Sequence, residues 1–158
     1  MWLMLLISLM SPAPEVCSSS EFGYEGDYLA GGRARHLGRP VDPTHDIGIA
    51  HRTLPLGSVV LLNVPKMGTW VFAVVIDRGP YGRIDETGSW YNGAEEWREC
   101  GRRSSCYPEG TRWRGCADLT PKTARLLSHD GWERIRIFPV KGSFIPRSVL
   151  LQQWGGNV

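Results

Sequence analysis

The sequence predicts a mainly β protein built around a small closed barrel, and three observations support this prediction. Segments 58–64 and 70–76 are almost continuously apolar, a pattern typical of strands with two buried faces. Met67 and Gly68 between them predict a tight turn, so the two strands should form a hairpin. The 19 glycines and 11 prolines favour short strands joined by turns over a helical bundle.

Composition and charge exclude several classes of protein. The 158 residues suffice for one domain with a buried core, and a chain with 42% hydrophobic and 22% charged residues is not fully disordered. No apolar run approaches twenty residues in length, so we expect no stable membrane span. The net charge of +2 is too small to indicate a nucleic-acid partner, and we expect none.

The amino-terminal residues 1–16 form a signal-like apolar segment. The run Trp2–Met10 has the length of the apolar part of a signal peptide and predicts export to the periplasm or the cell exterior. No Lys or Arg precedes this run, and Pro12 and Pro14 interrupt the small residues that follow it. An amino-terminal strand or a wrongly assigned start therefore stays an alternative. Residues 17–39 follow as a polar, glycine-rich tail or linker.

The remaining regular elements can be read from local signals. A short strand and a turn fall within Asp46–Pro55, just before the hairpin. One helix is expected after Thr120, a good N-cap that Pro121 follows at the first helical position. The pair Asp130-Gly131 should end this helix, and the alternation in Trp132–Val140 predicts a half-buried strand.

The predicted domain spans residues 40–141 and contains one long segment of weak periodicity. Residues 81–114 are rich in Trp, Arg, Gly and Cys, and we expect an ordered insertion there, with or without a hairpin of its own. Residues 142–158 are interpreted as a carboxy-terminal extension that the core does not need.

The four cysteines are compatible with an oxidising compartment. Two bridges among them allow three pairings, and the sequence does not choose between these. No histidine lies near the cysteine cluster at the spacing of a zinc site, so we expect no metal. The cysteines are Cys17, Cys100, Cys106 and Cys116.

Three motifs in a fixed order make the sequence specific. They read AHRTLPLGSVV at 50–60, VVIDRGPYGR at 74–83 and ADLTPKTARLLSHDG at 117–131, and a closing strand follows. This order resembles the rare lipoprotein A (RlpA)-like family of double-psi β-barrels, relatives of the expansin amino-terminal domain. The match covers roughly Asp46–Val140 without the segment 81–114. The resemblance implies a six-stranded double-psi barrel with one or two short helices and a surface groove for glycan.

The resemblance also implies catalytic positions. The histidine of the first family motif matches His51, and the aspartates of the second and third motifs match Asp77 and Asp118, with Thr120 where the family has serine. Transglycosylase members of the family carry a further acidic residue in a loop upstream of the histidine. Here that loop, residues 38–48, contains no glutamate. Its acids are Asp42 and Asp46, and Asp46 is retained as a candidate for substrate contact.

Cleavage of a glycosidic bond requires an acid that protonates a poor leaving oxygen. Asp77 is the first candidate, because the end of an apolar strand can desolvate it and raise its pKa. Its alternative role is to bond the backbone of the turn that follows, and Asp118 can equally support a helix amino terminus. His51 can orient a carboxylate, bind the sugar or serve the structure. No cofactor is needed for this chemistry.

Further side chains are candidates for binding the substrate. Arg78 follows Asp77 directly and can contact substrate or brace a barrel loop. Trp90 and Trp113 offer flat faces for sugar rings, and the alternative is that they build a small core with the cysteines.

Three hypotheses of function follow from these residues. The first is an exported or phage-associated lytic transglycosylase that cleaves peptidoglycan glycan strands. The second is a non-catalytic, expansin-like module that binds or loosens polysaccharide, and the third is a structural assembly module. We expect a monomer in each case.

Overall fold

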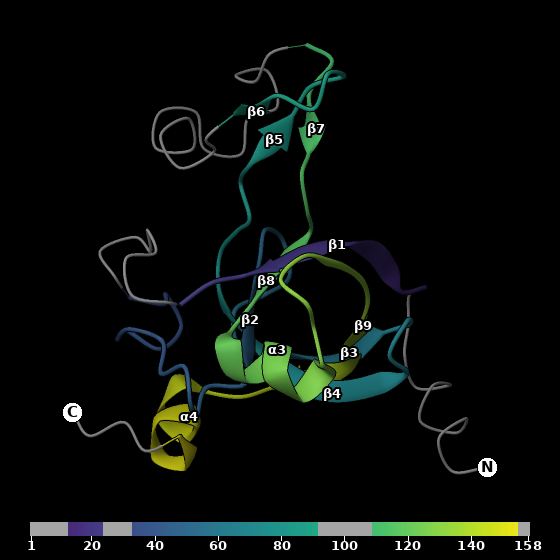
Figure 1. Cartoon of the computed structure of the whole chain (residues 1–158). Helices are drawn as coiled ribbons and strands as arrows, with labels where there is room; N and C mark the ends of the chain where they lie inside the picture. Colours follow the sequence, from purple (N-terminus) through teal and green to yellow (C-terminus); the bar gives the residue numbers. More distant parts are fainter. Residues whose placement is uncertain (1–12, 24–32, 92–108, 155–158) are drawn as a thin grey trace.

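The computed structural model describes residues 13–23, 33–91 and 109–154, and a closed six-stranded β-barrel dominates them (Figure 1). The barrel strands are β1 (Glu15–Glu21), β2 (Gly48–His51), β3 (Ser58–Val64), β4 (Thr69–Asp77), β8 (Ala117–Leu119) and β9 (Glu133–Phe144). They follow the order β1-β8-β2-β4-β3-β9, and β9 closes the barrel on β1. The pairs β1–β8 and β2–β4 are parallel and the other four are antiparallel, so the barrel is mixed.

The predicted hairpin is confirmed. Strands β3 and β4 pair in an unbroken antiparallel register from Val59↔Val74 to Val64↔Thr69. Gly68 has a φ of 67° in the connecting turn, a conformation that glycine adopts without steric cost. Aliphatic side chains of these and the neighbouring strands fill the barrel interior, among them Ile49, Val60, Leu62, Val75, Leu119, Ile135 and Ile137.

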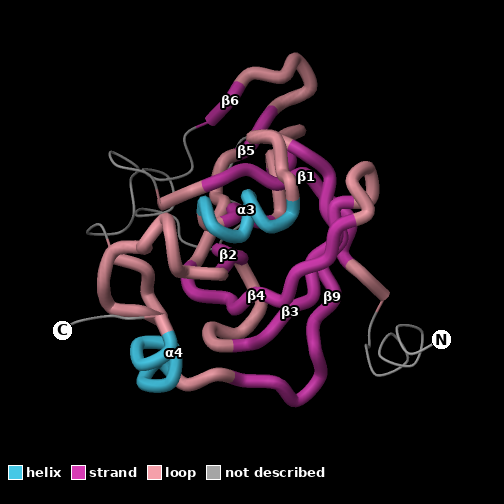
Figure 2. Tube along the Cα trace, turned by 60° about the horizontal axis from the view of Figure 1, so that its bottom comes forward, coloured by secondary structure: helices cyan, strands magenta, loops and turns pink. Residues whose placement is uncertain are grey.

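A short helix of about two turns, α3 (Pro121–Leu127), closes one opening of the barrel. Figure 2 shows it inside the ring of strands. Thr120 is its N-cap, and the Thr120 hydroxyl oxygen accepts the backbone N–H of Thr123, as the sequence predicts. Ala124 and Leu127 pack into the barrel core. The helix ends at Leu127, before the predicted Asp130-Gly131 stop, because Ser128 adopts the left-handed conformation with a φ of 54°.

The amino-terminal boundary differs from the prediction. Strand β1 lies across the expected signal-like segment 1–16 and the expected tail 17–39, and it pairs with β8 and β9. The polar residues of β1 give no hydropathy signal of a strand. Ser18 and Ser20 alternate with Cys17 and Ser19, and Cys17 packs against the core. The barrel therefore includes residues that composition assigns to a linker.

The carboxy-terminal extension also contributes to the packed structure. Strand β9 runs to Phe144, and helix α4 (Arg147–Gln153) follows it. Leu150 of α4 is fully buried in a second apolar cluster outside the barrel, together with Ala34, Leu37 and Ile76. The sequence predicts an extension that the core does not need, because the spacing of its few apolar residues does not show which surface they cover.

A small three-stranded sheet projects from the barrel between β4 and β8 (Figure 1). Its strands are β5 (Arg83–Ile84), β6 (Trp90–Tyr91) and β7 (Arg112–Trp113), in the order β6-β5-β7 with antiparallel pairing. Residues 92–108, which include Cys100 and Cys106, lie outside the described residues.

One disulfide joins two barrel strands. Cys17 of β1 is bonded to Cys116, which directly precedes β8, and their Cα atoms are 5.8 Å apart. This pairing agrees with an oxidising compartment. Within the described ranges, no helix combines the length and the apolar character needed to cross a bilayer.

Candidate functional site

Three neighbouring strands place Asp77 and Asp118 on either side of one small residue. Ala50 of β2 is the register partner of Asp77 in β4 and of Asp118 in β8. Adjacent strands lie about 4.8 Å apart, so the Cα atoms of the two aspartates are separated by roughly 10 Å. The structure thus brings together two of the three residues that the sequence predicted to be catalytic.

Asp118 faces the outside of the barrel wall, on the same side as its register partner Ala50. Ala50 packs in the second apolar cluster, outside the barrel. Asp118 lies between two residues of the barrel interior, so the alternation of the strand turns it outward. The β2–β4 register shifts next to Ala50, and Asp77 accepts a hydrogen bond from the backbone N–H of Arg35.

Gly79 leaves space beside Asp118. A Cβ atom at Gly79 would lie 3.7 Å from Oδ2 of Asp118 and 4.0 Å from the Cβ of Ala50, in contact with both. The Tyr81 ring also lies 4.0 Å from this position, so Ala50, Tyr81 and Asp118 surround Gly79. Gly79 also has a φ of 136°, which side-chain-bearing residues rarely adopt.

Asp77 is the more deeply buried of the two acids, with 4% of the residue exposed. Its Oδ1 accepts the Arg35 backbone N–H at 3.3 Å, and Arg35 Nε lies 4.0 Å from the same oxygen. Burial raises the pKa of Asp77, and hydrogen bonds from the backbone N–H groups of Arg78 and Arg35 oppose this shift only in part. A carboxyl group with a raised pKa can keep a proton for a poor leaving group.

The raised pKa of Asp77 predicts a pH dependence of stability. The unfolded chain releases this proton near its ordinary pKa of 3.8, whereas the folded protein holds it to higher pH. The free energy of unfolding should therefore fall as pH rises through that window. D77N removes the titration, so its stability relative to the wild type should rise as the pH increases above about 4. Urea unfolding at several pH values measures this difference, and a flat or opposite slope contradicts the assignment.

Asp118 lies in a different environment. It is half-buried, and its Oδ1 accepts a hydrogen bond from the hydroxyl of Ser20, its register partner in β1. The predicted alternative, in which Asp118 supports the amino terminus of the helix, is served instead by Thr120. Asp77 and Asp118 therefore differ in burial and in hydrogen-bond partners.

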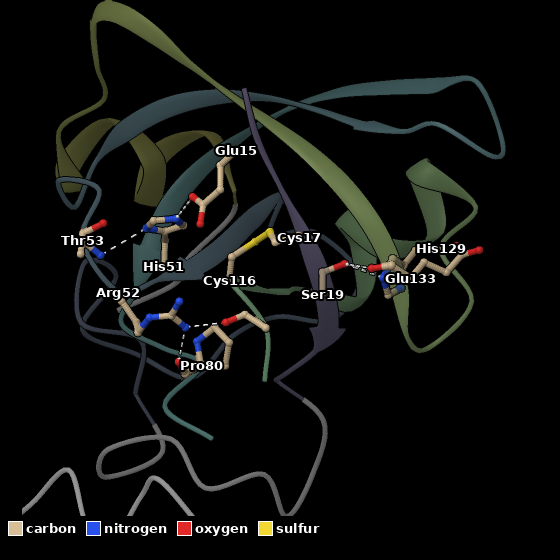
Figure 3. The surroundings of a disulfide bond; sticks show 11 residues. Glu15, Cys17, Ser19, His51, Arg52, Thr53, Pro80, Cys116, His129 and Glu133 are labelled. Atoms are coloured by element: carbon tan, nitrogen blue, oxygen red, sulfur yellow. Dashed lines mark hydrogen bonds and ion pairs between the residues drawn. A yellow bond between two sulfur atoms is a disulfide. The ribbon is translucent and has the colours of Figure 1, made fainter. Parts of the chain in front are cut away.

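His51 points to the other side of the wall. It is the register partner of Ala117 and is 4% exposed. Its Nδ1 accepts the backbone N–H groups of Thr53 and Leu54, at 3.2 and 3.1 Å, so the ring proton must lie on Nε2. That Nε2–H donates to Glu15 at 2.8 Å (Figure 3). The structure therefore gives His51 a fixed neutral tautomer that holds a turn and orients a carboxylate.

Glu15 is a residue that sequence reasoning missed. Its side chain is 45% exposed, and the hydrogen bond from His51 holds its pKa below the ordinary value. The family motif predicts a further acid in the loop 38–48, whereas Glu15 reaches His51 from β1, 36 residues earlier in the chain. No local pattern marks such a pair, because the segment around Glu15 resembles a signal peptide.

Two arginines brace the loops around the site. Arg78 donates from Nη1 to the carbonyl oxygens of His51 and Leu54, which realises the predicted alternative of a loop brace. Arg52 donates from Nη1 to the carbonyls of Pro80 and Gly115, at 2.7 and 2.5 Å (Figure 3). Arg52 therefore ties together the segments that precede Asp118 and follow Asp77.

Asp46 is held in an internal ion pair, in place of the predicted contact with substrate. Its side chain is fully buried, and its carboxylate oxygens accept from Nη1 and Nη2 of Arg39 at 2.7 and 2.8 Å. It also accepts the backbone N–H of Asp42 at 2.7 Å. With both oxygens engaged and no exposed surface, Asp46 is unavailable to a ligand.

Of the two tryptophans predicted to stack on sugar rings, the structure describes the side chain of Trp113 but not that of Trp90. The guanidinium carbons of Arg52 and Arg83 each lie 4.4 Å from the centroid of the Trp113 ring. These cation–π contacts engage the ring inside the molecule and fasten the small sheet to the barrel. The backbone of Trp90 belongs to β6, and its side chain lies outside what the structure describes.

A buried serine, histidine and glutamate also come together, away from the two aspartates. Ser19 Oγ lies 2.8 Å from His129 Nε2, and His129 Nδ1 lies 3.2 Å from Glu21 (Figure 3 shows Ser19 and His129). Ser19 and the His129 side chain have no exposed surface, and Ser19 Oγ also donates to the carbonyl of Glu133 at 3.1 Å. Without access for substrate, this network fastens β1 to β9.

One group of metal-ligand types occurs in the described part of the chain. It comprises Glu15, Cys17 and Cys116, and both sulfur atoms are bonded to each other in the disulfide. The disulfide accounts for the closeness of the two sulfur atoms, and Glu15 is hydrogen-bonded to His51.

A scan against protein-family models gives no match to the chain, and a search of curated proteins finds no significantly similar sequence.

Proposed function

We propose that the protein is a lytic transglycosylase that cleaves peptidoglycan glycan strands at Asp77 and Asp118. The observation that carries this proposal is the shared register partner, Ala50, which puts the two aspartates on the strands that flank β2. Beside Asp118, Ala50 and Gly79 contribute no large side chain. An exported or phage-associated protein with a disulfide fits such a substrate.

The barrel is proposed to be of the double-psi type, with residues 81–114 as an insertion into it. Two features support this: the barrel contains two parallel strand pairs, β1–β8 and β2–β4, and the three motifs lie on the adjacent strands β2, β4 and β8. The motif order in the sequence therefore corresponds to one contiguous patch in space.

The proposed reaction needs one acid/base and no cofactor. Asp77, with its raised pKa, gives its proton to the glycosidic oxygen as the C–O bond breaks. The sugar's own 6-hydroxyl attacks the anomeric carbon and returns its proton to the Asp77 carboxylate, which leaves a 1,6-anhydro end. Asp118, half-buried and bonded to Ser20, supplies negative charge beside the oxocarbenium-like transition state.

A second function is favoured by one observation. Asp77 is 4% exposed and is bonded to the backbone of Arg35, so its carboxylate has little room to reach a substrate. A barrel with this arrangement can bind or loosen polysaccharide without cutting it. This expansin-like role requires only the surface around Asp118 and Gly79.

The two functions are separated by digestion of purified peptide-free glycan strands and of whole peptidoglycan, with products identified by mass spectrometry. The transglycosylase proposal expects 1,6-anhydromuramyl ends from the wild type and a loss of at least about 100-fold in D77N. D130N, at an exposed aspartate outside the site, is the matched control and should retain full activity.

Other products decide between the alternatives. Reducing ends in place of anhydro ends would show a hydrolase and overturn the transglycosylase proposal. Binding to strands with no product would leave the non-catalytic role. Undiminished cleavage by a folded D77N would remove Asp77 from the mechanism.

A further inference from the structure

A second surface of the barrel carries aromatic and cationic side chains that the proposed reaction does not use. It lies on the outside of β4, β3 and β9. One register row joins Phe72, Leu61 and Phe138, and the next joins Trp70, Asn63 and Arg136. We call the residues Trp70, Phe72, Arg134, Arg136 and Phe138 the aromatic wall.

Two rings of the aromatic wall pack against each other, and two of its side chains are exposed. Trp70 and Phe138 have ring centroids 5.6 Å apart and an interplanar angle of 35°, and Phe138 is only 8% exposed. Trp70 and Phe72 are 36% and 53% exposed, although both occur on a strand whose other side fills the core. Large aromatic side chains that lie side by side and are partly exposed to solvent indicate an interaction surface.

The charge of the aromatic wall has one sign. Arg134 and Arg136 are exposed on β9, beside the aromatic rows. The stretches that form the wall, residues 61–63, 70–72 and 134–138, contain no Asp or Glu. The wall therefore complements a partner that combines apolar faces with negative charges.

We propose that the aromatic wall binds a glycan strand that carries carboxylate groups, as a holding surface separate from the pair Asp77 and Asp118. This inference rests on the proposed function for its choice of glycan. The apolar C–H faces of pyranose rings suit exposed aromatic side chains, and the arginines suit the carboxylates. A nucleic acid is disfavoured by the overall charge of only +2.

The position of the wall fits a holding role. Phe72 and Asp77 are five residues apart on β4, so they are separated by roughly 17 Å along the strand. A polymer held at the wall and at the aspartates would gain affinity from two linked contacts on one chain. The wall would then retain the protein on its polymer between cleavage events.

The test measures binding of the full chain by isothermal titration calorimetry, in the D77N background so that strands stay intact. The probes are a peptide-free strand of alternating N-acetylglucosamine and N-acetylmuramic acid and a chitooligosaccharide of equal length, which lacks carboxylates. Replacing Trp70 and Phe72 by alanine should weaken binding of both probes about tenfold. R134Q with R136Q should weaken only the carboxylated strand, by about threefold to fivefold.

The control is W132A, which removes another exposed tryptophan that lies before β9 and outside the wall. It should bind like the parent, and near-ultraviolet circular dichroism confirms that each variant is folded. Unchanged affinity in the wall variants, or no binding of either glycan by the parent, overturns the inference. Tighter binding to phosphatidylglycerol vesicles or to a single-stranded oligonucleotide also overturns it.

The outcome is distinguishable from that of the proposed function. Wall-dependent binding without any 1,6-anhydro product would retain the aromatic wall and refute the transglycosylase. Cleavage by the wild type, together with normal binding by the wall variants, would support the transglycosylase and refute the aromatic wall.

Discussion

Replacing Cys17 and Cys116 together by alanine is expected to lower the free energy of unfolding by about 4–5 kcal/mol. The bridge joins residues separated by 99 positions, so its loss frees most of the unfolded chain from a closed loop. It also fastens β1 to the start of β8, two strands that pair in parallel. Because β1 closes the barrel on β9, weakening its attachment should open the barrel at that seam.

Urea unfolding of the oxidised wild type and of C17A/C116A measures this loss. The matched control is C100A/C106A, which removes the two cysteines outside the described residues, six positions apart in the sequence. It should cost less, because any link between residues six positions apart would restrict the unfolded chain less. A C17A/C116A variant that unfolds within 1 kcal/mol of the wild type would show that the bridge contributes little.

The hairpin β3–β4 and the helix α3 could be predicted from the sequence because local signals specify them. Continuous apolar runs mark strands with two buried faces, and Thr120 with Pro121 marks a helix start. Strand β1 could not be predicted in this way. Its serines bond other parts of the chain, such as Ser20 with Asp118, and these partners lie about a hundred residues away.

The candidate site shows the same division. The motifs identified Asp77 and Asp118, and the structure places them around Ala50. They did not identify Glu15 as the partner of His51, nor the internal pairing of Asp46 with Arg39. Motif letters specify residue type and order, whereas the side of the wall on which a residue lies depends on register, and one shifted position reverses it.

Breaking the pair of Arg39 and Asp46 is expected to be nearly as damaging as losing the disulfide. R39M should lower the free energy of unfolding by about 3–5 kcal/mol because it leaves a buried carboxylate without its partner, and D46A should cost less because the guanidinium it leaves is partly exposed. R39M strands a carboxylate with no exposed surface, and D46A strands a guanidinium that is 22% exposed. The pair holds the segment that precedes β2, and so contributes to the placement of Ala50.

A double-mutant cycle from urea unfolding distinguishes this ion pair from two independent losses. R39M/D46A should cost clearly less than the sum of the single variants, since the second substitution removes the charge that the first one strands. D42N, on the same turn but with a side chain 41% exposed, is the control and should cost about 1 kcal/mol or less. Additive losses, or single variants as stable as the wild type, would mean that the pair does not act as a unit. In that case the position of Ala50 between the two aspartates would have to depend on the barrel strands alone.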